Sequence, residues 1–131
     1  MPSFTKVANG NITPARFVKL DVTADGRVLQ AGAGEQIYGI SQAGTRNTPY
    51  STLDDGFAAI AGENLKIFGP PDKEIMLELG GTVVRGDRLK SDASGRGLAT
   101  VIALDEVGAI AAASGVLGEL IPVQCIPPAK L

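Results

Sequence analysis

The 131-residue chain contains no histidine and no tryptophan, and it has one cysteine, two tyrosines and four phenylalanines. Without histidine, the chain lacks the usual general base of serine and cysteine nucleophiles and the commonest zinc ligand. A single cysteine cannot build a disulfide framework. Cys125 lies within the apolar run LIPVQCIP, where we expect a buried and unreactive thiol.

The chain also lacks a charge of one dominant sign and any long apolar run. Its 12 basic and 14 acidic residues are scattered and give a net charge of -2, so the basic stripe typical of nucleic-acid binding is missing. No stretch approaches the roughly 20 apolar residues of a membrane helix. The opening MPSFTKVANG has no apolar signal core. We therefore expect a protein made in a cytoplasm, with neither nucleic acid nor membrane as a partner.

Three motifs with catalytic or ligand-binding spacing each lack a residue that their chemistry requires. GISQA, beginning at Gly39, approaches a nucleophile elbow, but no histidine is present to activate Ser41. DVTADG, beginning at Asp21, places oxygens like a calcium loop, but Gly32 stands where a bidentate glutamate is needed. GAGEQIYG has Ile37 where a dinucleotide-binding turn needs its third glycine. The sequence predicts no enzyme, no catalytic residue, no metal site and no cofactor.

Seventeen glycines and short alternations of apolar and polar residues divide the chain into strands and turns. This pattern predicts an all-β fold, a single compact β-sandwich or β-barrel domain with at most short helices. The predicted strands are 16–20, 27–31, 36–41, 64–68, 74–79, 87–90, 98–102, 109–113 and 120–126. Two alanine-rich stretches, DDGFAAIAG and DEVGAIAAASG, are alternative sites for a short helix.

Two stretches of the chain resemble each other, VKLDVTADGRVLQ at residues 18–30 and LKSDASGRGLAT at residues 89–100. Each has the pattern of a strand, a polar turn and a returning strand. The matched pairs are Lys19 and Lys90, Asp21 and Asp92, Gly26 and Gly95, and Gly39 and Gly108. We expect two similar hairpin-based units, so that residues 18–41 and 89–110 superpose. Chance recurrence of turn formers is the alternative.

The expected core is built from small side chains, because aromatic residues make up only 5% of the chain. Each small side chain buries little apolar area, and burial contributes about 25 cal/mol per Å², so a monomer would be only marginally stable. A subunit interface would bury further apolar surface. The composition therefore predicts a homo-oligomer.

Several stretches together resemble the small capsid decoration, or cement, proteins of tailed bacteriophages. They are NGNITPARFVKLD with the hairpin after it, QIYGISQAGTRN, AAIAGENLKIFGPPDKEIMLELGG and GDRLKSDASGRG, and they span residues 8–123. The resemblance rests on the order of strands, glycines and turns, and it transfers no functional residue. It implies a homotrimer on the outer capsid surface of the virion, bound to the major capsid protein and stabilising its lattice, after synthesis in the host bacterial cytoplasm.

The expected capsid contacts lie in an extended N-terminal arm, residues 1–14, ahead of a β decoration domain, residues 15–131. Apolar residues are spaced among polar ones in the arm, and Pro14 restrains the chain before the first predicted strand. Such an arm can add a strand to an exposed sheet edge of a partner. The long loop 42–56 is the second expected contact. The candidate contact residues are Phe4, Val7, Ile12, Arg46 and Tyr50.

A small-molecule or glycan-binding β-barrel is the alternative function. It would need a concave apolar pocket with aromatic side chains available for stacking. The aromatic residues are dispersed along the sequence, at Phe4, Phe17, Tyr38, Tyr50, Phe57 and Phe68.

Overall fold

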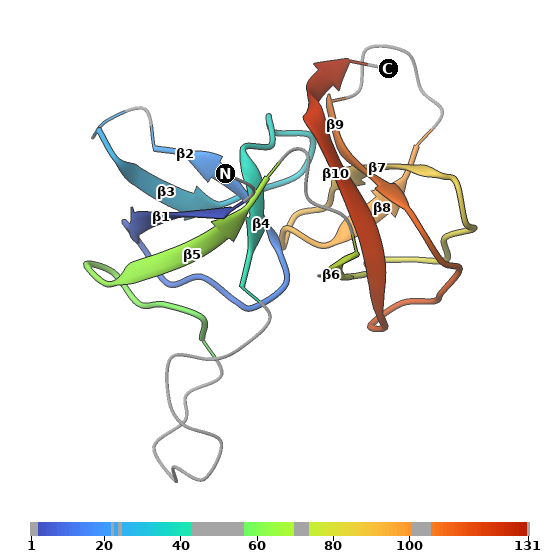
Figure 1. Cartoon of the computed structure of the whole chain (residues 1–131), viewed down its shortest axis with the longest axis horizontal. Helices are drawn as coiled ribbons and strands as arrows, with labels where there is room; N and C mark the ends of the chain where they lie inside the picture. The colour runs from blue at the N-terminus through green and yellow to red at the C-terminus, as the bar shows by residue number, and fades with distance from the viewer. Residues whose placement is uncertain are drawn as a thin grey trace, which may run out of the picture.

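The structure is a computed structural model that describes residues 3–21, 23, 25–42, 57–69, 74–100 and 106–130. These residues form ten strands and no helix, arranged as two units that lie side by side (Figure 1). The predicted all-β class is confirmed. Among the described residues, no helix is long and apolar enough to cross a membrane.

The first unit, residues 3–69, is a closed five-stranded barrel in the order β1-β3-β2-β4-β5. Its strands are β1 (Ser3–Ala8), β2 (Phe17–Leu20), β3 (Arg27–Gln30), β4 (Gly39–Ser41) and β5 (Asn64–Phe68). Neighbouring strands are antiparallel, except that β1 runs parallel to β3. Small and branched apolar side chains fill its interior: Ala8, Ile12, Val18, Val28, Ala58, Ala59, Leu65 and Ile67.

The second unit, residues 74–130, is a five-stranded sheet in the order β6-β10-β9-β7-β8. Its strands are β6 (Ile75–Glu78), β7 (Arg88–Ser91), β8 (Gly97–Ala99), β9 (Glu106–Ala111) and β10 (Leu120–Lys130). A parallel bridge between Leu79 and Gly97 brings its two edges together, so the sheet curls toward a second barrel. Its core also takes in four residues of the first unit: Phe17, Ala31, Ile37 and Ile40.

The two units share one topology, which confirms the predicted duplication. β2 lies between β3 and β4 just as β7 lies between β8 and β9, and all four pairings are antiparallel. The register is the same as well. Val18 pairs with Gln30 in the first unit, and Leu89 pairs with Ala99 in the second. Leu89 follows Val18 by 71 residues and Ala99 follows Gln30 by 69, which are the same offsets that relate the matched turn residues.

The duplication extends beyond the two hairpins to every strand of the units. The parallel bridge between Ala8 and Val28 recurs between Leu79 and Gly97, and the β1–β5 ladder recurs as the β6–β10 ladder. The offset falls from 70 residues between β4 and β9 to 56 between β5 and β10. The first unit therefore has 14 more residues in this connection, which includes the predicted loop 42–56.

One matched pair is displaced by a residue. Gly39 pairs with Val18, and Ala109 pairs with Leu89, so Gly39 corresponds to Ala109 rather than to Gly108. The connection before β9 is one residue longer than the connection before β4, because the offset rises from 69 to 70 there.

The N-terminal residues are extended, as expected, but they do not form an arm ahead of the β domain. β1 pairs with β5 from Ser3 opposite Phe68 to Val7 opposite Asn64, and Val7 also pairs with Arg27 of β3. Both edges of β1 are occupied at Val7, so this strand closes the barrel. The expected boundary between residues 1–14 and residues 15–131 is therefore corrected.

Neither alanine-rich stretch is helical where it is described. β9 covers EVGAIA, and in the other stretch Ala59 forms a β-bridge with Ile12. β9 lies between β7 and β10, and an added Cβ at Gly108 would lie 2.6 Å from the Cγ2 of Ile37. Small residues there allow neighbouring elements to approach closely, and this requirement outweighs their helix propensity.

Candidate interaction surfaces

The turn after β7 of the second unit docks on the first unit. The N–H of Phe17 donates to the carbonyl oxygen of Gly95 over 2.7 Å. The Nε2 of Gln30 and the Nη1 of Arg16 both donate to the carbonyl oxygen of Ser94, over 2.6 and 2.9 Å. Three donors of the first unit thus hold one turn of the second.

The same joint continues between the edges of the second unit. The N–H of Glu78 donates to the carbonyl oxygen of Ala15 over 3.0 Å, so residues 15–17 lie between β6 and the turn before β8. In the first unit the corresponding seam is closed, because Val7 donates directly to the carbonyl oxygen of Gly26 over 3.1 Å. In the second unit, residues 15–17 of the first unit therefore supply the backbone hydrogen-bond partners for Glu78 and Gly95, whose counterparts in the first unit bond directly to each other.

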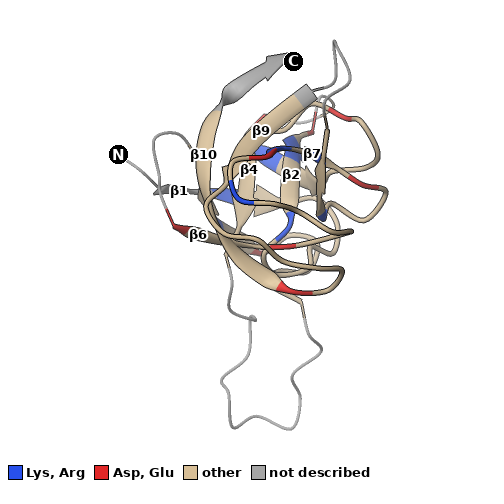
Figure 2. Ribbon diagram, turned by 90° about the vertical axis from the view of Figure 1, so that its right-hand side faces the viewer, with Lys and Arg blue, Asp and Glu red and all other residues tan. Residues whose placement is uncertain are grey.

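A charged cluster reinforces the joint. Arg16 and Glu78 form an ion pair of 3.1 Å across the two units. Arg96 lies 4.0 Å from the same Glu78 carboxylate and 3.1 Å from Asp92. Among the described residues, no group of three or more metal-ligating side chains gathers here or elsewhere. Acidic and basic residues are otherwise interspersed along the described ribbon (Figure 2).

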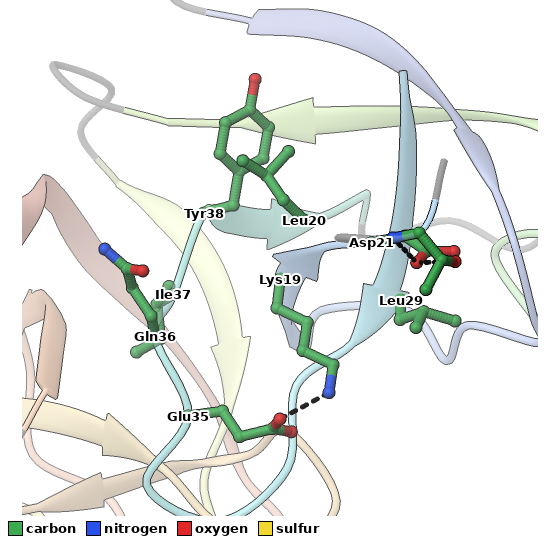
Figure 3. A pocket seen from close by; sticks show the side chains of 9 residues that line it. Lys19, Leu20, Asp21, Leu29, Glu35, Gln36, Ile37 and Tyr38 are labelled. Carbon is green, nitrogen blue, oxygen red and sulfur yellow. Dashed lines mark hydrogen bonds and ion pairs between the residues drawn. The ribbon is translucent and has the colours of Figure 1, made fainter. Parts of the chain in front are cut away.

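The corresponding turn of the first unit is open and borders a pocket of about 490 Å³ (Figure 3). Leu20 is 48% exposed in this pocket, whereas Ser91, its counterpart in the second unit, is 1% exposed. Ser91 is covered because its carbonyl oxygen accepts a hydrogen bond from Gly34 of the first unit, over 3.2 Å. The described lining residues are Lys19, Leu20, Asp21, Thr23, Leu29, Glu35, Gln36, Ile37 and Tyr38.

The charged groups of the pocket are already engaged within the chain. Asp21 accepts hydrogen bonds from the hydroxyl and the N–H of Thr23, over 2.6 and 2.9 Å, and from the side chain of Asn9. The Thr23 hydroxyl is the largest cause that lowers the pKa of Asp21. Lys19 lies 2.5 Å from Glu35, and its hydrogen bond lowers the pKa of that carboxyl. Both carboxyls are thus held ionised, which does not suit a general acid.

Aromatic side chains do not line this pocket together. Of the described lining residues, Tyr38 alone is aromatic. Phe17 lies fully buried in the core between the units, and Tyr50 lies outside the described residues. The pocket supports the alternative ligand-binding hypothesis, but the described residues around it do not form the aromatic platform that this hypothesis needs.

Four large apolar side chains are exposed at one end of the second unit, on two adjacent turns and at the first residue of β10. A bridge between Val83 and Gly115 holds these turns side by side, and Glu119 accepts a hydrogen bond from the N–H of Val116 over 2.7 Å. We call this surface the apolar tip. Its members and exposed fractions are Val84 at 60%, Val116 at 52%, Leu117 at 61% and Leu120 at 50%. Their counterparts in the first unit are Thr13, Ile60, Ala61 and Asn64.

The residues expected from the sequence to contact a capsid do not form this surface. Ile12 is 0% exposed in the core of the first unit, so its expected role as a contact is corrected. Val7 is half-buried within β1, and Phe4 is opposite Ile67 in the β1–β5 ladder. Arg46 and Tyr50 lie outside the described residues.

The apolar tip was missed because Val84 is some 30 residues from Val116, Leu117 and Leu120 in the sequence, and only the fold brings the two segments together. A signal was present nonetheless. VV at 83–84 and VLGEL at 116–120 place large apolar residues at turn positions, beside glycines, where polar residues are usual.

The fold is similar to that of a solved phage protein. No protein-family model matches the sequence, and a comparison with curated proteins finds no match. Among solved structures, the chain is similar to the head fibre gp8.5 N base of bacteriophage phi29, with a TM-score of 0.69 and 18% sequence identity. The match covers 98% of this chain and 96% of that chain. The expected likeness to proteins of tailed-phage heads is therefore confirmed at the level of the fold.

Proposed function

We propose that this chain is a structural protein of a tailed-phage virion that binds the outer surface of the head and stabilises the lattice of the major capsid protein. The observation that carries the proposal is the likeness to a head fibre base over nearly the full length of both chains. The sequence resemblance to capsid decoration proteins, which rests on the order of strands, glycines and turns, supports the same role.

Stabilisation of a shell requires no catalysis. A protein that binds the mature shell more tightly than its disrupted form shifts the equilibrium toward the shell by mass action. An oligomer that engages several capsid subunits at once gains avidity well beyond one contact. A homotrimer, the state that the resemblance implies, therefore suits a symmetric lattice.

The apolar tip is the capsid contact that we propose. Soluble proteins rarely expose apolar side chains in large contiguous patches, and such patches commonly mark sites of protein association. The counterparts of Val84, Leu117 and Leu120 in the first unit are smaller or polar. The apolar character of the tip is thus a feature of one unit rather than of the shared fold. The loop 42–56, with Arg46 and Tyr50, is the second proposed contact.

The proposal is tested by binding to phage heads that lack the protein. Leu117→Asp places a charge on the apolar tip, and Ala61→Asp makes the same change at the corresponding exposed turn of the first unit. Wild-type protein and Ala61→Asp are expected to co-sediment with heads, whereas Leu117→Asp remains in the supernatant with an unchanged circular dichroism spectrum. Failure of the wild-type protein to bind heads would refute the function. Equal binding by Leu117→Asp would refute only the tip as the contact.

A small-molecule or glycan-binding role is the alternative, and the 490 Å³ pocket is the observation that favours it. A panel of sugars and metabolites in a thermal-shift assay would distinguish the two roles. A ligand that raises the melting temperature of wild-type protein, but not of a Tyr38→Ala variant, would favour this alternative.

A further inference from the structure

The contact between the two units has a direction. The turn of the second unit, residues 92–96, is held by residues of the first. No described residue of the corresponding turn of the first unit, residues 21–27, makes such a contact with the second. The two units are therefore joined head to tail, although their folds are related by duplication. A head-to-tail contact leaves two faces unused: the turn face of the first unit, and the face of the second unit that would receive such a turn.

The unused turn face lies on the first unit, beside the pocket. Leu20, Thr23 and Asp25 are exposed there. In the second unit the counterpart of Leu20 is the buried Ser91. In the second unit this surface is covered by the first unit. In the first unit the same surface carries an exposed leucine, and no described residue of another unit covers it.

The unused receiving face lies on the second unit. Arg16, Phe17 and Gln30 hold the docked turn in the first unit. Their counterparts by strand register are Asp87, Arg88 and Ala99. Phe17 is fully buried, whereas Arg88 and Ala99 are exposed at β7 and β8. The guanidinium of Arg88 has the charge that would complement Asp25 of an incoming turn. The carboxylate of Asp87 accepts a hydrogen bond from the N–H of Val84 within its own unit, over 2.9 Å.

We propose that the β2–β3 turn of one chain docks on the exposed β7–β8 face of a second copy, in the same head-to-tail arrangement that joins the two units within a chain. This inference rests on the self-association in the proposed function and names its interface. A repeated head-to-tail contact closes into a ring when its rotation permits. The seam of the first unit is already closed by Val7 and Gly26, so the contact uses the outer face of the turn and Leu20 rather than an inserted strand.

Cysteine cross-linking without capsid tests the contact directly. Gln30 lies beside Ser94 within the chain, and the corresponding residues for a contact between chains are Ala99 and Thr23. A mixture of Thr23→Cys and Ala99→Cys chains, treated with a short bismaleimide, is expected to give a covalent dimer that neither chain gives alone. Cys125 is 3% exposed and should not react. A Gln30→Cys, Ser94→Cys chain is the intrachain control. In a second control, Gln124→Cys, at an exposed position of β10, replaces Ala99→Cys.

A second variant measures the contribution of Leu20. Leu20→Asp is expected to abolish the oligomer in light scattering at a concentration where wild-type protein is assembled, whereas Leu117→Asp on the apolar tip leaves it assembled. A monomeric wild-type protein would overturn the inference. An oligomer that survives Leu20→Asp, or that cross-links equally well through Gln124→Cys, would overturn it too. Head binding by a monomer would leave the proposed capsid role intact, so the two failures are distinguishable.

Discussion

Ala15 and Gly86 occupy the same position in the two units, and both have a left-handed backbone, with φ of 56° and 94°. Each lies just before the central hairpin strand of its unit. A residue with a Cβ in this region is strained by about 1 to 2 kcal/mol. The second unit avoids that strain with glycine, whereas the first unit retains it at a residue that also anchors the joint through its carbonyl oxygen.

Exchanging the two residues should therefore have unequal effects. Gly86→Ala introduces a strained residue into open space and should lower the free energy of unfolding by about 1 kcal/mol. Ala15→Gly relieves the strain but loses a buried methyl group and makes the unfolded chain more flexible. These effects offset one another, and the net change should be below about 0.5 kcal/mol. Urea denaturation of both variants measures the difference, and equal losses would contradict this account.

The turn glycines Gly26 and Gly95 provide a matched pair for the joint between the units. Both have positive φ, 73° and 81°, so alanine should be strained equally at each. A Cβ at Gly26 would meet nothing within 4 Å, whereas a Cβ at Gly95 would lie 3.0 Å from the carbonyl oxygen of Phe17 and 3.3 Å from that of Ala31.

Gly95→Ala should therefore cost more than Gly26→Ala. We expect a loss of about 1 kcal/mol for Gly26→Ala and of about 3 kcal/mol for Gly95→Ala, because the added methyl group must also displace backbone at the joint. Both are best measured by urea denaturation in a Leu20→Asp background, where self-association does not contribute. Similar losses in the two variants would show that the joint accommodates the methyl group.

The duplicated hairpins could be predicted from the sequence because their turns depend on residues with few substitutes. Asp21 and Asp92 each accept a hydrogen bond from the N–H two residues later, and a glycine completes each turn. These local requirements keep the same residue types in both copies. The register of β4 against β2 depends instead on contacts distant in sequence, and for this reason the match of Gly39 with Gly108 was off by one residue.

β1 and the apolar tip could not be predicted in the same way. SFTKVA has too few large apolar residues for a clear strand pattern, and its place is set by pairing with β5, some 60 residues later. The joint between the units was missed for a similar reason, because residues 15–17 both lead into β2 and act as partners of the second unit. A pattern of apolar and polar residues does not indicate that a segment pairs with two different parts of the fold.

Loss of the first strand should prevent folding rather than merely release a partner. Removing residues 2–13 deletes β1 together with the buried Ala8 and Ile12, which exceeds what a marginally stable domain can lose. A milder change, Ile12→Ala, should lower the free energy of unfolding by about 2 to 4 kcal/mol, while Asn11→Ala at the exposed neighbour stays within about 0.5 kcal/mol. Thermal denaturation checks both. A truncated chain with a cooperative transition near that of wild-type protein would show that β1 is dispensable.

Acid should weaken the open turn of the first unit through Asp21. The hydrogen bonds from Thr23 and Asn9 lower the pKa of this carboxyl in the folded chain, so the unfolded chain binds the proton more readily. The contribution to stability is complete above the ordinary aspartate pKa of about 4, and it is lost as the pH falls through the lower folded value.

Asp21→Asn removes this titration. The variant should be less stable than wild-type protein at pH 7, because a neutral amide accepts weaker hydrogen bonds and its NH2 group faces that of Asn9. As the pH falls from 5 to 2, the wild-type protein should lose stability more steeply, so the two urea midpoints should converge. Glu35→Gln should give a smaller convergence of the same sign, because Lys19 lowers the pKa of that carboxyl as well. Parallel pH curves for wild-type protein and Asp21→Asn would show that the hydrogen bonds to Asp21 do not stabilise its ionised form.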